Sequence, residues 1–177
     1  LTGLGFKVAV FLSGKASQIV DDNARKNCET LMALRNSVFI HEIYDSSLLP
    51  EVKANVLVDA LLGTGLKGPP KPPILNLIKV INEADGFRVA VDIPSGLDSD
   101  SGKVLGEAVK ADLTITFHKV KPGLVEAKEY TGELVVGKIG IPEEIEGYVG
   151  PGDVAMVVEP RLPESHKGDF GRLLVIG

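Results

Sequence analysis

Apolar and polar positions follow two different rhythms along this chain. Short runs of consecutive apolar residues recur at intervals and predict strands that are covered on both faces. These runs lie at residues 6–12, 38–44, 55–59, 87–92 and 113–117, with weaker ones at 133–137 and 154–158.

Between the strands, apolar positions recur every three or four residues, which predicts helices. One stripe follows a possible N-cap at Ser17, and a second follows Pro72 and Pro73, which suit the first turn of a helix. The stripes are Val20, Ala24, Cys28, Leu31 and Leu34, then Ile74, Leu77, Ile78 and Ile81. Strand and helix in this order predict an α/β protein, with a three-layer Rossmann-like fold, a mainly parallel sheet and helices on both faces.

Both ends of the chain look abrupt, so we expect a fragment of a longer protein. Pro160, Pro163 and the polar residues 164–167 form a predicted linker, and a new strand begins at residues 172–176. We therefore expect one domain at residues 1–158, lacking its N-terminal part. Residues 159–177 would then hold a linker and the first strand of another domain.

The charge balance argues against nucleic acid as a partner, because 19 basic and 24 acidic side chains give a formal net charge of −5. The single cysteine, Cys28, excludes an internal disulfide and suits a reducing compartment, so we expect a cytoplasmic protein. No apolar run approaches the roughly 18 residues of a membrane span, so no membrane partner is expected.

Two predicted strands end in an aspartate that leads into a glycine-rich loop. These residues are Asp59 and Asp92. Open α/β sheets bind ligands at the carboxyl ends of their strands, which favours a shared site. The alternative is that each carboxylate only caps its own loop.

The segment after Asp59 matches the pattern G-x-G-x-x-G over residues 63–68, and Asp92 follows at a spacing close to that of dinucleotide-binding proteins. The match is weakened by the prolines after Gly68, which forbid the helix that this fingerprint requires. The loop could still bind phosphate through its N–H groups and Lys67, or it could be a plain surface loop.

Residues near these strand ends, including Asp92 itself, carry possible chemistry. The Ser95 hydroxyl could hold a hard cation together with Asp59. Partial desolvation of Asp92 is expected to raise its pKa, which would help it to carry a proton near neutral pH. Lys119 and Lys121 could contact a phosphate, although a solvated position on the rim is the preferred interpretation.

Three runs, VLVDALLGTGLKG, AVDIPSGLDSDSG and ADLTITFHKVKPGL, resemble the NAD(P)H-hydrate epimerase family of the YjeF N-terminal type. The likeness covers about residues 6–158. The tail SHKGDFGRLLVIG resembles the start of the ADP-dependent NAD(P)H-hydrate dehydratase domain that is fused to the epimerase in bifunctional repair enzymes.

The resemblance implies an isomerase that interconverts the R and S forms of hydrated NADH or NADPH, a small-molecule dinucleotide substrate. It implies a potassium ion at Asp59 and Ser95, a substrate contact at Asp92, and ADP or ATP as cofactor of the dehydratase. We assign Asp92 the catalytic acid–base role in this reaction, with binding of the ribose as the alternative. We also expect a homo-oligomer. The substrate-binding segment that it implies is Gly63, Thr64, Gly65, Leu66, Lys67, Gly68 and Pro69.

One departure and two rival functions remain open. The asparagine- and glycine-rich loop of this family, of the form NNGGD, should precede Phe6 and is absent from the sequence. The G-x-G-x-x-G pattern with Asp92 permits an NAD(P)-dependent oxidoreductase instead. A binding module without catalytic activity on the same fold is the other alternative.

Overall fold

The computed structural model describes residues 1–34, 37–49 and 51–153. The chain divides into two compact units, Leu1–Ile139 and Gly140–Gly177. Within the described part of the second unit, a 3-10 helix, η4, spans Glu143–Gly147. The strands predicted at residues 154–158 and 172–176 lie outside the described residues.

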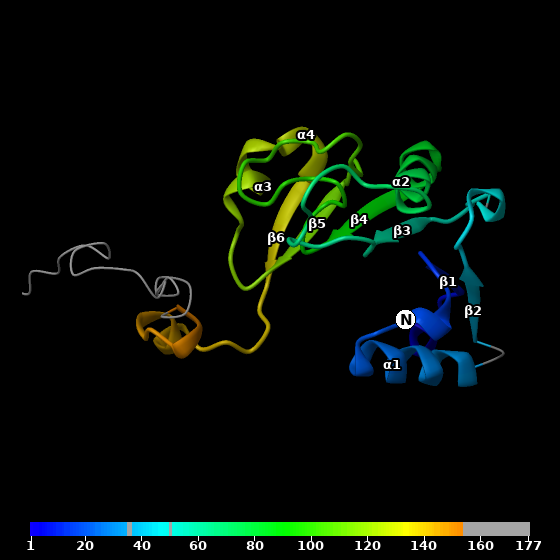
Figure 1. The fold of residues 1–177 in the computed structure, drawn as a ribbon, viewed down its shortest axis with the longest axis horizontal. Helices are drawn as coiled ribbons and strands as arrows, with labels where there is room; N and C mark the ends of the chain where they lie inside the picture. Colours follow the sequence, from blue (N-terminus) through cyan, green and yellow to red (C-terminus); the bar gives the residue numbers. More distant parts are fainter. Residues whose placement is uncertain (35–36, 50, 154–177) are drawn as a thin grey trace, which may run out of the picture. The chain divides into compact units, whose positions relative to one another are not determined.

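Six strands confirm the predictions from the apolar runs, with ends that differ by at most two residues. All paired strands run parallel, which confirms the α/β class, but the described strands form two sheets where the pattern predicted one (Figure 1). One sheet pairs β1 with β2, and the other has the order β3-β4-β5-β6. The strands are β1 (Val8–Leu12), β2 (Val38–Glu42), β3 (Val56–Asp59), β4 (Phe87–Val91), β5 (Leu113–Phe117) and β6 (Glu133–Gly137).

The first long helix, α1 (Asp22–Ala33), begins later than the stripe predicted. Its cap is Asp21, whose carboxylate accepts a hydrogen bond from the Ala24 N–H at 2.8 Å. Asp22 adds a second negative charge in the first turn, where the helix dipole favours it. Ser17 lies in a separate 3-10 helix, η2 (Ala16–Gln18). Of the predicted stripe only Cys28 is buried, and Val20 is 91% exposed and precedes the helix.

The second long helix, α2 (Ile74–Glu83), starts directly after Pro73, as the proline argument predicts. The chain between Gly68 and Ile74 forms no helix, which confirms that the prolines after Gly68 prevent one there. Two short helices that the sequence pattern missed follow β5: α3 (Pro122–Glu126) and α4 (Lys128–Thr131). No helix in the described residues combines the length and the apolar character that crossing a membrane would require.

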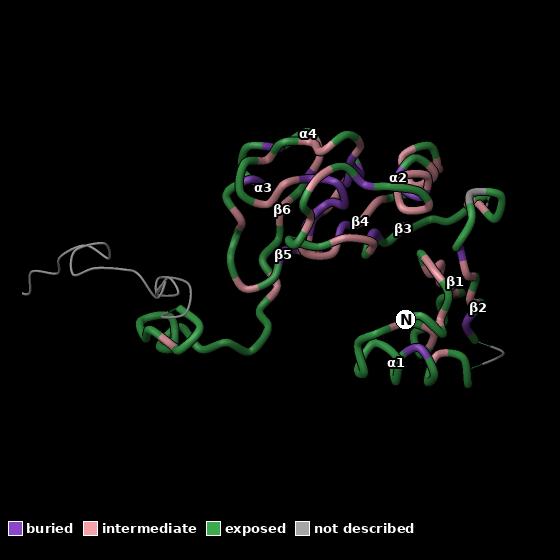
Figure 2. The backbone as a smooth tube through the Cα atoms, in the orientation of Figure 1, coloured by how far each residue is buried: buried purple, intermediate pink, exposed green. Residues whose placement is uncertain are grey.

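Buried residues gather in the four-stranded sheet and the segments next to it (Figure 2). The two faces of this sheet differ in burial. In Figure 1, α2, α3 and α4 lie on the same side of this sheet. The Thr114 hydroxyl donates to the carbonyl of Thr131 in α4 at 2.8 Å, which shows that α4 covers the face carrying Thr114. The buried residues on this face are Leu57, Asp59, Ala90, Thr114 and Thr116, whereas the opposite face exposes Val56, Val58, Phe87, Phe117 and Val135.

The loop that follows β4 supplies much of the core beneath these helices. Ile93 and Leu97 are each 1% exposed and pack in one cluster with Leu124 of α3. Between them, Gly96 has a φ of +93°, a conformation that glycine adopts without the steric cost other residues bear. A Cβ atom there would lie 2.0 Å from the carbonyl oxygen of Glu107.

We expect Gly96→Ala to lower the free energy of unfolding by roughly 2 kcal/mol or more, because it adds left-handed strain to a backbone clash. Urea unfolding measures this loss. Gly14→Ala is the matched control, since nothing lies within 4 Å of the added methyl group and its φ is not left-handed. Equal stability of the two variants would contradict the tight packing of this loop.

Candidate functional site

Parallel pairing places the carboxyl ends of β3, β4 and β5 at one edge of the sheet. Asp59 pairs with Ala90, and Val91 pairs with Ile115. Asp59 is the last residue of β3, and Asp92 directly follows β4. The two carboxylates therefore end neighbouring strands, as the sequence predicted.

Asp59 binds the loop that follows the neighbouring strand. Its Oδ1 accepts the Ser95 hydroxyl at 2.6 Å, and its Oδ2 accepts the Ser95 N–H at 2.8 Å. The N–H of Leu61 adds a bond of 3.2 Å to Oδ1. Both Asp59 and Ser95 are 1% exposed. These contacts join the end of β3 to the loop after β4 through a buried carboxylate.

Burial raises the pKa of Asp59, and the hydrogen bonds from Ser95 and Leu61 oppose that rise without cancelling it. Ionised Asp59 is thus costly in the folded protein, and a nearby positive charge would reduce that cost. The Leu62 carbonyl lies 3.4 Å from the Ser95 hydroxyl, so carboxylate, hydroxyl and carbonyl oxygens meet here. An all-oxygen donor set of this kind fits a hard cation.

Many metal sites in proteins are built from several carboxylate, histidine or cysteine side chains. The described ranges contain no group of three or more such side chains arranged to hold a metal ion. The oxygen donors of Asp59 and Ser95 also differ from the nitrogen and sulfur ligands of a typical zinc site.

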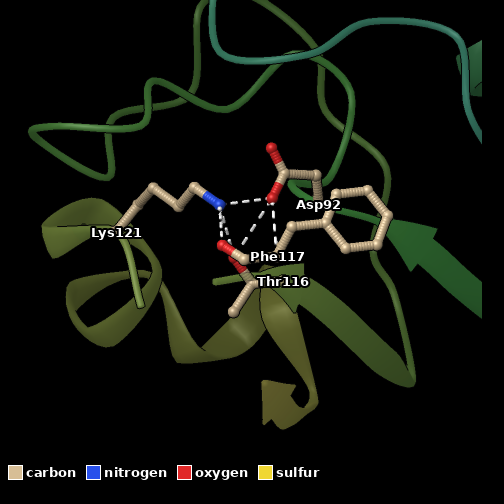
Figure 3. Close-up of polar contacts among 4 residues, drawn as sticks. All are labelled: Asp92, Thr116, Phe117 and Lys121. Carbon is tan, nitrogen blue, oxygen red and sulfur yellow. Dashed lines mark hydrogen bonds and ion pairs between the residues drawn. The ribbon is translucent and has the colours of Figure 1, made fainter. Parts of the chain in front are cut away.

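Asp92 turns toward β5 and takes part in a second, separate set of contacts (Figure 3). Its Oδ1 accepts the Phe117 N–H at 2.9 Å and the Thr116 hydroxyl at 3.3 Å, and it pairs with the Lys121 ammonium. Figure 3 shows the other carboxylate oxygen pointing away from these three residues. The contacts therefore fix the carboxylate through one oxygen.

The expectation of a raised pKa at Asp92 is wrong. Burial does push the pKa of Asp92 upward, but hydrogen bonds from Lys121 and Phe117, together with the charge of Lys121, lower it overall. The interpretation of Lys121 as a solvated rim residue is also wrong, because only 21% of its side chain is exposed. A lysine 29 residues away from Asp92 gave no signal in the spacing.

The glycine-rich loop begins beside the Asp59–Ser95 contact. The Leu62 N–H donates to the Ser95 hydroxyl at 2.9 Å, which anchors the residue before Gly63. Most of the following residues are exposed, and two are half-buried. The exposed residues are Gly63, Thr64, Gly65, Lys67 and Pro69, and the half-buried ones are Leu66 and Gly68. The loop thus extends from the carboxyl edge with its backbone open to a ligand.

Comparison with known proteins places this arrangement in a family. Residues 1–123 match the family described as "YjeF-related protein N-terminus". The chain belongs to this YjeF-related family. The bifunctional NAD(P)H-hydrate repair enzyme Nnr of Hyperthermus butylicus is 46% identical over 177 residues, which are 100% of this chain and 33% of that protein.

Shorter relatives match the YjeF-related chain over less of its length. The NAD(P)H-hydrate epimerase of Nitrosopumilus maritimus is 37% identical over 146 residues, 82% of this chain and 66% of that protein. The crystal structure of the yeast protein ynu0 has a TM-score of 0.66 and 20% identity, covering 93% of this chain and 65% of that one. This similarity shows the shared fold. The chain spans about a third of the length of the bifunctional relative.

The buried carboxylate of this YjeF-related chain predicts a pH-dependent stability. Because the folded pKa of Asp59 lies above its ordinary value of 3.8, its ionisation destabilises the folded state as pH rises from that value through the folded pKa. Asp59→Asn cannot ionise. The free energy of unfolding of the wild type relative to this variant should therefore fall by up to about 1.4 kcal/mol per pH unit in that window.

Urea unfolding in potassium-free buffer between pH 4 and 7 measures this difference. Asp98→Asn serves as the control, because hydrogen bonds from Ser101 lower the pKa of Asp98 and it should show no such loss. A difference between wild type and Asp59→Asn that stays constant with pH would contradict the burial argument.

Proposed function

We propose that this YjeF-related domain interconverts the R and S forms of hydrated NADH or NADPH. The observation that carries the proposal is the carboxylate of Asp92, which is fixed at the carboxyl edge by Thr116, Phe117 and Lys121. The names of two relatives, a bifunctional NAD(P)H-hydrate repair enzyme and an NAD(P)H-hydrate epimerase, support it.

The chemistry fits an ionised carboxylate. The reacting carbon bears a hydroxyl group and the ring nitrogen, so inversion can proceed through loss and return of hydroxide or through ring opening and closure. Loss of hydroxide leaves a cationic ring while the hydroxide takes a proton from solvent, and ring opening moves the proton of the hydroxyl group to the ring nitrogen. A lowered pKa keeps Asp92 ionised at neutral pH. There it stabilises the cationic ring and accepts the proton of the returning water in the first route, or accepts the hydroxyl proton and passes it to the nitrogen in the second. General acid–base catalysis of this kind contributes about 10²–10⁴-fold.

The glycine-rich loop supplies the binding of the dinucleotide in this proposal. Nothing lies within 4 Å of a Cβ added at Gly63 or Gly65, so the backbone there is accessible. Successive N–H groups in such a loop form a concave anion site, and Lys67 adds a positive charge. The segment that binds the substrate is Gly63, Thr64, Gly65, Leu66, Lys67, Gly68 and Pro69.

Asp59 and Ser95 hold a potassium ion in the same proposal. When bound, the ion supplies the positive charge that favours ionised Asp59 in its buried position. Asp59, Ser95 and the Leu62 carbonyl provide oxygen donors where the end of β3 meets the loop after β4. The ion would therefore order the start of the glycine-rich loop.

The larger protein would couple this reaction to dehydration of the S form with ADP or ATP. The bifunctional relative matches 100% of the chain and the epimerase matches 82%, which supports a domain 1–158 followed by the start of a dehydratase at 159–177. The buried, unpaired Cys28 suits the reducing cytoplasm. A homo-oligomer belongs to the same proposal, and sedimentation of the full-length protein tests it.

The oxidoreductase alternative has less support. Its fingerprint needs a helix at the third glycine, and the chain forms none between Gly68 and Ile74. It also needs the first βα turn, whereas β1, α1 and β2 precede this loop.

A stereochemical assay tests the proposal. Purified R-hydrated NADH is incubated with the full-length protein, and the appearance of the S form is followed by chromatography. Interconversion well above the spontaneous rate supports the epimerase. Hydride transfer would support the oxidoreductase, and binding without either reaction would support the binding module.

We expect Asp92→Asn to retain the binding of hydrated NADH and to lose roughly 10²-fold or more in epimerisation, because the amide keeps the shape but accepts no proton. Steady-state kinetics and a direct binding measurement separate the two effects. Weakened binding with normal turnover would show instead that Asp92 only holds the ribose.

We expect potassium to raise the melting temperature of the wild type and to leave that of Asp59→Ala unchanged. A binding free energy of 1 kcal/mol raises the Tm of a domain this size by roughly 2–4 °C. Choline chloride at equal ionic strength is the control for general salt effects. The assignment fails if Asp59→Ala responds to potassium as the wild type does.

A further inference from the structure

Asp92 occupies a strained turn at the end of its strand. Its φ is +68°, a value that few residues with a side chain adopt. The Ile93 N–H donates to the Val91 carbonyl at 2.9 Å, so the chain closes a three-residue turn around Asp92. Strained backbone of this kind persists only where surrounding contacts hold it, and it clusters at functional sites.

The Lys121 side chain supplies such contacts from the loop that follows β5. Its ammonium group pairs with Asp92 and donates to the Thr116 hydroxyl and the Phe117 carbonyl, each at 3.0 Å. An ammonium group has three N–H donors, and three acceptors surround this one. Lys121 is also the N-cap residue of α3, so the start of that helix sets its place.

The two side chains are equally sheltered from solvent, at 21% exposure for Lys121 and 23% for Asp92. A pair sheltered to this degree is screened less by salt than a pair on the open surface. Other titratable groups at this edge are Asp59, which ends β3, His118 and Lys119, which follow β5, and Lys138, which follows β6. Asp59 is engaged with Ser95, and among the described residues it is Lys121 whose ammonium group pairs directly with Asp92.

We propose that Lys121 is the positioning residue for Asp92: it holds one carboxylate oxygen so that the other faces the substrate. This inference rests on the proposed epimerase function and extends it to Lys121, for which the sequence suggested only a possible phosphate contact. Lys121 does not touch the reacting atoms in this proposal. Its effect on the reaction passes through the ionisation and the orientation of Asp92.

The test compares Lys121→Met with Lys121→Arg in the full-length protein. We expect Lys121→Met to lower kcat for epimerisation about ten- to a hundredfold while the Kd for hydrated NADH changes less than about threefold. The acid limb of its pH–rate profile should move to higher pH, because the opposing charge is lost while burial remains. Lys121→Arg keeps the charge, so its acid limb should stay at the wild-type pH.

Lys128→Met is the matched control, since it removes the same charge from an exposed position in α4 and should leave kcat and the acid limb unchanged. A purely structural role for Lys121 would lower stability without moving the acid limb, and that result would overturn the proposal. If Lys121→Met does not fold, Lys121→Gln takes its place, because it also removes the charge: an acid limb at higher pH with a lowered kcat supports the proposal, and an acid limb at the wild-type pH overturns it.

Titration of the Asp92 carboxyl carbon by NMR, without substrate, separates failure of this inference from failure of the proposed function. A raised pKa of Asp92 in Lys121→Met, in a protein that epimerises nothing, refutes the function while the Lys121 contact stands. Suppose instead that the wild-type protein is active and that Lys121→Met changes neither the titration of Asp92 nor kcat. This result refutes the inference about Lys121 and leaves the proposed function standing.

Discussion

Parallel pairing of β3, β4 and β5 is the constraint on which the candidate site depends. It brings three strand ends to one edge, although the residues that follow them are far apart in sequence. Asp59 then reaches Ser95 across one strand boundary, and Asp92 reaches Thr116 and Lys121 across the next. If one of these strands ran antiparallel, its amino end would lie at this edge. One partner of the Asp59–Ser95 contact or of the Asp92–Lys121 contact would then be missing from the edge.

The two carboxylates at this edge experience opposite environments. Asp59 is enclosed with neutral hydrogen-bond donors, and burial raises its pKa. Burial of Asp92 is outweighed by Lys121 and the Phe117 N–H, so its pKa falls. Environments that separate the pKa values of two neighbouring acids commonly assign them different roles. Here the separation fits a cation ligand at Asp59 and an ionised catalytic group at Asp92.

The sequence predicted the strands and the position of Asp59 and Asp92 at the ends of neighbouring strands, because both follow from where an apolar run stops. Prediction from the sequence failed for residues whose role depends on contacts between distant parts of the chain. Lys121 lies in a loop that only the β4–β5 pairing brings to Asp92, so no local pattern identifies it. The prediction that Ser17 is an N-cap was wrong for a local reason, because the Asp21 carboxylate caps helix α1 instead. The short helices α3 and α4 hold too few turns to show a periodic stripe.

The most direct test of the site is a crystal structure of the full-length protein with hydrated NADH bound. We predict that the nicotinamide ring lies against the Asp92 carboxylate and that the pyrophosphate lies on the loop from Gly63 to Pro69. A dinucleotide bound elsewhere, with Asp92 and this loop untouched, would contradict the assignment of the carboxyl edge as the active site.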